Sequence, residues 1–95
     1  MRIRWSDAAV GDLDDLTQFI RLRDPKAAVK VRMRIVAATQ YLTEFPEIGR
    51  GTLRPKYRLY VVKGLPYHIG YRVESDFIEV AAVIDGRMNR SPDLW

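Results

Sequence analysis

The sequence contains no cysteine, a single histidine and no long apolar run. Without cysteine, neither a disulfide framework nor a thiolate metal site can form, which fits a reducing compartment. No segment approaches the roughly 20 apolar residues of a membrane-spanning helix. Aspartates rather than an apolar stretch follow Arg2 and Arg4, so we expect no signal peptide. These absences favour a cytoplasmic protein that uses no metal and no cofactor.

Acidic residues are scarce in two segments of the chain. Arginine accounts for 12 of the 16 basic residues, and the formal net charge is +4. Six basic residues stand against one acid between positions 21 and 34, and five stand against none between positions 50 and 63. Because arginine suits bidentate contacts to phosphate and carboxylate, this distribution predicts an anionic partner, either nucleic acid or an acidic protein.

The helices are expected in the first half of the chain. Its 95 residues are too few for two cores, so we expect a single domain over residues 1–95. Residues 1–5 alternate like a short strand. Ser6 and Asp24-Pro25 are helix start signals, each followed by apolar residues spaced three or four positions apart, which predicts helices from residue 7 to about 22 and from 25 to Phe45-Pro46.

Three strands are expected in the second half, over residues 57–62, 67–73 and 77–84, after a surface loop at residues 47–56. The connections between them are short enough for antiparallel hairpins. The last strand is apolar on both faces, which favours a central position in the sheet. The order βααβββ predicts an α+β sandwich of two layers, with a helical hairpin packed on one face of a mainly antiparallel sheet.

The first hairpin of this sheet predicts two different faces. Alternation assigns one set of residues to the core, namely Tyr57, Leu59, Val61, Tyr67, Ile69, Tyr71 and Val73. The other set would remain open to solvent, namely Arg58, Tyr60, Val62, His68, Gly70 and Arg72. An open face that combines arginine with aromatic residues indicates a binding surface, although arginine is also a common means of keeping a sheet soluble.

Several motifs in this order resemble the RelE/ParE superfamily of type II toxin-antitoxin toxins, and most closely its ParE branch. They are Trp5 before the Ala-rich first helix, Asp24-Pro25-x-Ala27-Ala28, Phe45-Pro46-x-x-Gly49-Arg50, Pro66-Tyr67-x-Ile69-x-Tyr71-Arg72 and Val83-x-x-Gly86-Arg87. Proteins similar to RelE cleave mRNA in the ribosomal A site, whereas those similar to ParE poison DNA gyrase without an identified catalytic cluster. The resemblance also implies a cognate antitoxin that folds on binding.

A ribonuclease requires a base, an acid and cations for the phosphorane. The resemblance places Arg58 at a basic position of the second strand, His68 where an arginine is common, and Arg87 after the last strand. Imidazole titrates near neutrality, so His68 fits a proton carrier, but a lone histidine on a strand is more often an ordinary surface residue. Tyr60 replaces a further basic residue of the family pattern, and this departure disfavours RelE-type chemistry.

Residues expected to contact a partner are Tyr60, Arg72, Arg50 and Trp95. Tyrosine can stack on bases, and a tryptophan at the end of the chain is expected to pack on its own core or on a partner. Residues 50–56 form an alternative basic surface. Gly49 is expected to end the helical hairpin with a turn at positive φ.

Two groups of charged residues receive a simpler interpretation. The basic stripe Lys26, Lys30 and Arg34 lies on one face of the second helix, as the charged side of any exposed helix would. The acids Asp12, Asp14 and Asp15 lack the spacing of a calcium loop and are expected on a solvated face of the first helix.

The sequence therefore favours a ParE-like toxin that inhibits DNA gyrase by binding and is neutralised by an antitoxin. One alternative is an mRNA endonuclease with ribosomal mRNA as its target, which would use Arg58, His68 and Arg87. The other is a degenerate family member that binds only its antitoxin.

Overall fold

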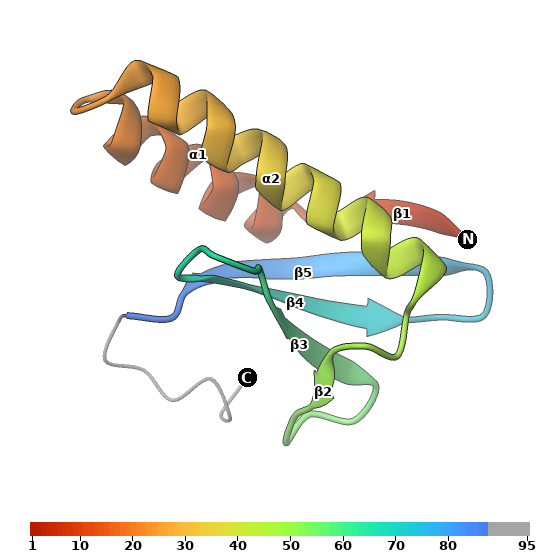
Figure 1. Cartoon of the computed structure of the whole chain (residues 1–95). Helices are drawn as coiled ribbons and strands as arrows, with labels where there is room; N and C mark the ends of the chain where they lie inside the picture. The colour runs from red at the N-terminus through yellow and green to blue at the C-terminus, as the bar shows by residue number, and fades with distance from the viewer. Residues whose placement is uncertain (88–95) are drawn as a thin grey trace.

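The computed structural model describes residues 1–87 of the 95-residue chain (Figure 1). Two helices form one layer and five strands form the other, as the α+β expectation requires. The elements in chain order are β1 (Arg2–Trp5), α1 (Asp7–Arg21), α2 (Pro25–Glu44), β2 (Arg50–Gly51), β3 (Tyr57–Val61), β4 (Tyr67–Val73) and β5 (Phe77–Asp85).

Both helices begin at the predicted capping residues. The Ser6 hydroxyl oxygen accepts the backbone N–H of Ala9 at 3.1 Å, and the Asp24 carboxylate accepts that of Ala27 at 3.1 Å. Each side chain thereby satisfies one of the N–H groups that the first helical turn leaves without a partner. Phe45 caps the other end of α2.

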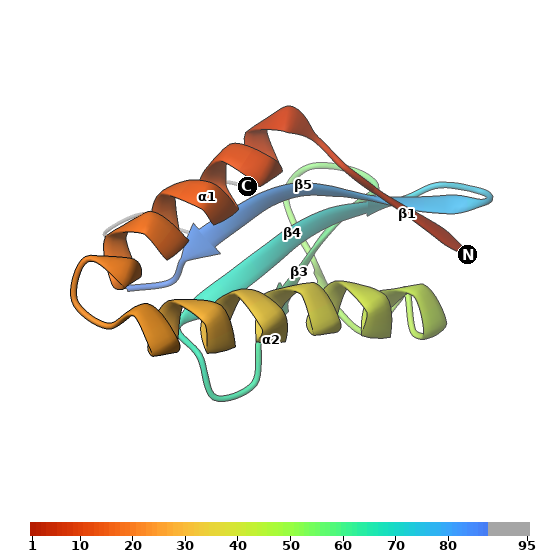
Figure 2. The ribbon, with the colours of Figure 1, turned by 90° about the horizontal axis from the view of Figure 1, so that it is seen from above.

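The predicted apolar faces of the helices form the core. Ala9 and Leu13 of α1 are buried, and so are Ala28, Ile35 and Leu42 of α2. Seen from the helix side, the two helices meet at the turn after α1 and diverge toward their other ends (Figure 2). The core cluster therefore lies between this hairpin and the sheet, where the helices meet side chains of β4 and β5.

The sheet has the order β1-β5-β4-β3-β2, so β5 is an interior strand paired on both sides, as its apolar sequence predicts, and β4 is the middle one. Strand β5 pairs with β4 in antiparallel orientation and with β1 in parallel orientation. The segment 47–56, expected to be only a loop, contains β2, in which Arg50 pairs with Leu59 and Gly51 with Arg58. A two-residue strand has no periodicity to reveal it, and the free edge of β3 supplies its pairing.

The N-terminal part of α1 completes the outer edge of β5. Strand β1 pairs with β5 only as far as Val80. Beyond that point, Ser6 donates to the carbonyls of Val80 (N–H, 3.0 Å) and Ala81 (hydroxyl, 3.2 Å), and the carboxylate of Asp12 accepts the N–H of Val83 at 3.0 Å. The expectation that Asp12 belongs to a solvated face was wrong, because a partly buried backbone amide required an acceptor.

No helix within residues 1–87 is long and apolar enough to cross a membrane.

Candidate functional site

The register of β3 differs from the alternation that the sequence predicts. Tyr60 lies opposite Ile69, and Arg58 lies opposite Tyr71. Directly opposed residues share a face of the sheet, and the Tyr60 ring lies 6.2 Å from the ring of Tyr41 in α2. Arg58 and Tyr60 therefore lie on the helix side, and their assignment to the open face was wrong.

The turn between β3 and β4 explains the error. Its four residues, 63–66, are closed by a hydrogen bond from the N–H of Val62 to the carbonyl of Tyr67 at 3.0 Å. Because four residues separate Val62 from Tyr67, each odd-numbered residue of β3 pairs with an even-numbered residue of β4. Val61 therefore lies opposite His68, on the open side. Leu59 also points to that side, yet it is only 2% exposed and stands outside the main core cluster.

Tyr71 and Arg58 both hydrogen-bond to the backbone of residues 46–49, the junction that follows α2. The Tyr71 hydroxyl donates to the Pro46 carbonyl at 2.8 Å and accepts the N–H of Gly49 at 2.9 Å. The Arg58 guanidinium donates to the carbonyls of Gly49 at 2.7 Å and of Glu47 at 3.2 Å. Burial raises the pKa of the Tyr71 phenol, and the hydrogen bond from Gly49 opposes this shift. Both side chains are thus committed to the protein's own backbone.

Gly49 is required at this junction by close approach. A Cβ atom there would lie 2.6 Å from the Tyr71 hydroxyl oxygen and 3.0 Å from the Leu59 carbonyl. The expected positive φ is absent: among residues 1–87, Gly64 is the only glycine with a positive φ. The Pro-x-x-Gly spacing indicated a special glycine, but it could not indicate the tyrosine 22 residues later that requires it.

On the open face, Arg72 is paired with two carboxylates. Its guanidinium lies 2.5 Å from Glu74 and 3.4 Å from Glu79. Its buried Nε has no hydrogen-bond partner among the described residues. Because both acids and the arginine are only 22–28% exposed, the Arg72 charge is largely neutralised, and its prediction as a partner contact stays a prediction.

His68 lies at the other end of β4 and packs against Gly86. A Cβ atom at Gly86 would lie 2.5 Å from the His68 Nε2, and the Gly86 N–H donates to the Pro66 carbonyl at 2.7 Å. The Nδ1 of His68 is buried and has no hydrogen-bond partner within residues 1–87. His68 is therefore held by packing, with one ring nitrogen unsatisfied by the described part of the chain.

Arg87 forms a bidentate pair with Asp85, at 3.0 Å from Nε and 2.9 Å from a terminal nitrogen. The hydrogen bond from Arg87 lowers the pKa of Asp85, and this partner in turn raises the pKa of Arg87. The guanidinium also lies 5.9 Å from the centre of the Tyr67 ring. Asp85 lies opposite Tyr67 in the sheet, on the face of Ile69, so the Asp85–Arg87 pair stands at the same end of β4 as His68 but Asp85 does not share its face.

The three candidate catalytic residues do not converge. Arg58 is on the helix side and bound to the junction, whereas His68 is on the open side, three residue pairs farther along the hairpin and near Arg87. Tyr60 is half-buried beside α2, and Arg50 is exposed on the edge strand β2. Trp95, the remaining predicted contact residue, lies outside the described residues.

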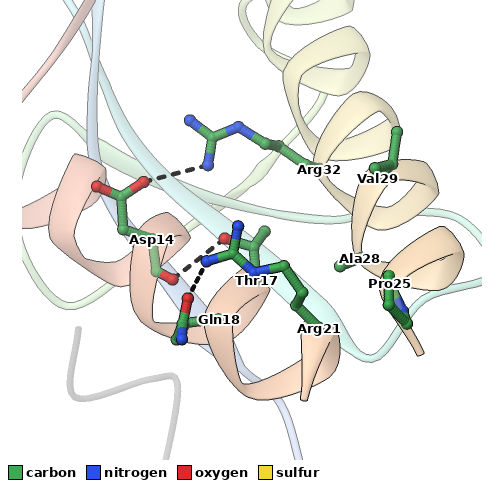
Figure 3. Close-up of a pocket in the computed structure, with 8 residues that line it drawn as sticks. All are labelled: Asp14, Thr17, Gln18, Arg21, Pro25, Ala28, Val29 and Arg32. Atoms are coloured by element: carbon green, nitrogen blue, oxygen red, sulfur yellow. Dashed lines mark hydrogen bonds and ion pairs between the residues drawn. The ribbon is translucent and has the colours of Figure 1, made fainter. Parts of the chain in front are cut away.

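The helical hairpin carries a groove of about 330 Å³ between its two helices (Figure 3). Asp14 pairs with Arg32 across it at 3.1 Å, and Arg21 donates to Gln18. Next to this groove, α2 exposes a row of apolar residues at helical spacing, namely Val29, Met33 and Val36. The predicted core stripe of α2 did not reveal this second apolar surface, although its spacing was present in the sequence.

No group of three or more metal-ligating side chains lies together within residues 1–87.

Comparison with known proteins identifies the family. A family model described as "ParE toxin of type II toxin-antitoxin system, parDE" matches residues 3–90. The Sinorhizobium fredii protein Y4kP, whose name marks it as a suspected toxin, is 37% identical over 83 residues, which cover 87% of this chain and 85% of Y4kP.

Two toxins of Caulobacter vibrioides are also similar. ParE3 is 32% identical over 87 residues (88% of this chain, 85% of ParE3), and RelE2 is 29% identical over 82 residues (86% and 91%). A chain of the structure "Chromosomal ParDE TA system from P. aeruginosa" shares the fold, with a TM-score of 0.78 at 23% identity over 90% of this chain and 95% of that one. The chain therefore belongs to the ParE toxin family of type II toxin-antitoxin systems.

Proposed function

We propose that the protein is a cytoplasmic toxin that inhibits DNA gyrase by binding and that a cognate antitoxin neutralises it. The observation that carries this proposal is the division of the candidate catalytic residues between the two sides of the sheet. Arg58 is bound to the backbone of the junction on the helix side, whereas His68 lies on the open side at the far end of the hairpin and Arg87 pairs with Asp85 beyond that end.

RNA cleavage by a 2′-hydroxyl requires a base within hydrogen-bond reach of that hydroxyl and cations around the same phosphate. The positions of Arg58 and His68 do not supply this convergence. A gyrase inhibitor needs no such convergence, since it acts through a complementary surface. Family membership together with this geometry favours binding over side-chain chemistry.

The outer side of α2 suits the antitoxin. Met33 is 66% exposed and Val29 is 59% exposed, which is unusual for apolar side chains in a row along one helix. Lys26, Lys30 and Arg34 follow the same helix, and no acidic residue occurs in α2 before Glu44. An amphipathic helix with acidic flanks would complement this surface in both apolarity and charge.

The test of gyrase inhibition uses purified, antitoxin-free protein with gyrase, ATP and supercoiled plasmid. After detergent and protease treatment, linear plasmid above the level of the toxin-free control is the expected result. A reaction without gyrase is the control for contaminating nuclease. If folded protein produces no linear plasmid, inhibition by trapping broken DNA is refuted.

The second candidate function is ribosome-dependent mRNA cleavage. The proximity of His68, Asp85 and Arg87 at this end of β4 favours it, since imidazole can carry protons and arginine can bind phosphate. Cut mRNA and arrested translation in expressing cells would support it, whereas SOS induction and filamentation would support gyrase inhibition. Harmless expression of folded protein would indicate a degenerate toxin that only binds its antitoxin.

The antitoxin surface has its own test. Met33→Glu places a charge in the apolar row of α2 and is expected to abolish co-purification with the antitoxin. Phe19→Glu is the matched control, because Phe19 is similarly exposed (60%) but lies on α1. Equal loss in both variants would contradict a docking surface on α2.

A further inference from the structure

The open face of the sheet, the side away from both helices, carries an apolar strip across its middle. Leu59, Gly70 and Ala82 lie side by side there, on β3, β4 and β5. Leu59 is only 2% exposed and Gly70 is buried, although no helix or strand within residues 1–87 lies over this face (Figure 1). Residues on the uncovered face of a two-layer sandwich are ordinarily exposed to water, so this burial requires a cover.

Two polar atoms beside the strip are shielded in the same way. The Nδ1 of His68 and the Nε of Arg72 are buried and have no hydrogen-bond partner within residues 1–87. On a face open to solvent, water would satisfy such atoms. His68 and Arg72 flank Gly70 along β4, one on each side of the strip. Their shielding, together with that of Leu59, points to a cover over the middle of the open face.

The chain comes to this face at the end of β5. The Gly86 N–H donates to the Pro66 carbonyl at 2.7 Å, and a Cβ atom at Gly86 would lie 2.5 Å from the His68 Nε2. The backbone of Gly86 therefore lies against a ring of the open side. A turn follows, in which the Asp85 carboxylate accepts the N–H of Arg87 at 2.9 Å. The described chain thus ends at the His68 end of the open face.

The remaining residues, 88–95, are long enough to reach the strip. Gly70 lies four residues after Pro66, which corresponds to about 13 Å at the rise of a strand. Eight residues in extended conformation span up to about 26 Å. A segment that starts next to His68 therefore reaches Gly70 with residues to spare. Its last two residues, Leu94 and Trp95, are apolar and match the character of the strip.

We propose that residues 88–95 dock on the open face of their own sheet, with Leu94 and Trp95 against the strip of Leu59, Gly70 and Ala82. Gly70 has no side chain and Ala82 has only a methyl group, which leaves room for a flat indole ring between longer neighbours. A separate partner would have to compete with a segment that is tethered at the end of this face and is therefore present at a high effective concentration.

This docking goes beyond the proposed function, since it concerns the folded chain alone. It closes the face that the sequence indicated as a binding surface. A partner then either binds elsewhere, for example along α2, or displaces the segment first.

Tryptophan fluorescence tests the docking, because Trp5 and Trp95 are the only tryptophans of the chain. Trp5→Phe leaves Trp95 as the single emitter in the full-length toxin, purified without antitoxin. Its emission is expected to be blue-shifted relative to the urea-unfolded chain, and acrylamide is expected to quench it about threefold less. Both quantities are measured over a range of protein concentrations.

Two further variants in the Trp5→Phe background locate the contact. Gly70→Thr places a side chain in the strip and is expected to move the Trp95 emission toward that of the unfolded chain. Gly51→Thr is the matched control on the edge strand β2, and its emission should not change, because nothing lies within 4 Å of its Cβ position. Circular dichroism confirms that each variant is folded. If Gly70→Thr does not fold, Ala82→Lys provides the same test from β5.

Thermal unfolding gives a second readout. Removal of Leu94 and Trp95 exposes the strip and is expected to lower the Tm by about 5 °C or more. Leu22→Ser is the control, because it removes an apolar side chain that is already 77% exposed, and it should change the Tm by less than about 2 °C.

The proposal is overturned if acrylamide quenches Trp95 equally in the folded and the unfolded chain, or if Gly70→Thr leaves the emission as unchanged as Gly51→Thr does. It is also overturned if the blue shift disappears on dilution, since the occupant is then a second copy. A blue shift that appears only with the antitoxin would overturn it in favour of a partner. A failed gyrase assay would instead refute the proposed function and leave this docking standing.

Discussion

The two Gly-Arg pairs of the chain occur at opposite ends of β4 and have opposite roles. Gly49 packs against Tyr71 on the helix side, where every polar group of the contact is hydrogen-bonded. Gly86 packs against His68 on the open side, where Nδ1 of the imidazole has no partner within residues 1–87. The same Gly-Arg dipeptide thus lies at a fully hydrogen-bonded junction around Gly49 and beside solvent-accessible polar side chains around Gly86.

The comparison shows that a family motif by itself does not mark a functional site. Arg58 looked like a catalytic residue in the sequence, yet its guanidinium holds two carbonyls of the first junction. Asp85 and Arg87 at the second junction satisfy each other while they remain accessible to solvent. A side chain that is committed to buried backbone groups contributes to stability, whereas a solvent-accessible cluster is free to serve a partner.

The largest expected effect comes from alanine substitution at the two glycines. Gly49→Ala is expected to lower the free energy of unfolding by about 3 kcal/mol, because its Cβ meets a hydrogen-bonded tyrosine and a backbone carbonyl. Gly86→Ala is expected to cost less, about 1–2 kcal/mol, because the half-buried imidazole can rotate away. Urea unfolding of both variants measures the difference.

Double variants sharpen this prediction. His68→Ala is expected to recover most of the stability lost in Gly86→Ala, whereas Tyr71→Phe cannot rescue Gly49→Ala, because a ring carbon at 2.8 Å and the Leu59 carbonyl at 3.0 Å remain. Gly51→Ala is the control, since nothing lies within 4 Å of its Cβ position. Equal rescue at both junctions would contradict the distinction drawn between them.

The Tyr71 hydroxyl is expected to have the next largest effect. Tyr71→Phe removes it and leaves the Gly49 N–H and the Pro46 carbonyl without their partner, at a cost of about 1–3 kcal/mol. Burial raises the pKa of Tyr71 above that of the unfolded chain, so its contribution is present below about pH 10 and is lost as the pH rises through the folded-state pKa. Stability of the wild type, measured from pH 8 to 11, should therefore fall more steeply than that of Tyr71→Phe; parallel curves would refute this.

Arg58 distinguishes a structural role from a catalytic one. Arg58→Met is expected to lower stability by about 1–2 kcal/mol, since two carbonyls lose a charged donor. Toxicity is then expected to decline only as far as the folded fraction declines. Growth inhibition and unfolding are measured on the same variant, and complete loss of toxicity from a protein that remains folded would support the ribonuclease alternative.

His68 is expected to be dispensable for toxicity. His68→Ala removes a half-buried ring that makes no hydrogen bond through Nδ1 to the described residues, so stability should change little. Gyrase inhibition through a binding surface does not require the imidazole. Expression of the folded variant should still arrest growth, and a harmless variant would count against binding as the mechanism.

The smallest expected effect is at Arg87. Its hydrogen bonds lower the pKa of Asp85, so their contribution to stability is present above the unfolded pKa of about 3.9 and is lost as the pH falls through the lower folded-state value. Arg87→Gln is therefore expected to move the acid unfolding midpoint to slightly higher pH. Solvent exposure keeps this shift small, and a shift toward lower pH would show that the pair destabilises the fold.

Local signals in the sequence determined most of the fold. Ser6 and Asp24 mark the helix starts because their side chains satisfy nearby N–H groups, and the spacing of Ile35 and Leu42 marks a buried face through helical geometry alone. The apolar sequence of residues 77–84 indicated a central strand for the same reason. In each case the cause lies within a few residues of the pattern.

Only the tertiary structure decided which residues form a site. The register set by the four-residue turn at 63–66 places Arg58 and Tyr60 on the helix side. Because β1 is short, the backbone N–H of Val83 in β5 is left to donate to the carboxylate of Asp12. Gly49 required a tyrosine 22 positions away. These outcomes depend on strand register and on contacts between distant segments. Neither can be read from the periodicity of the sequence, because a shift of one residue in register exchanges the two faces of a strand without changing its composition.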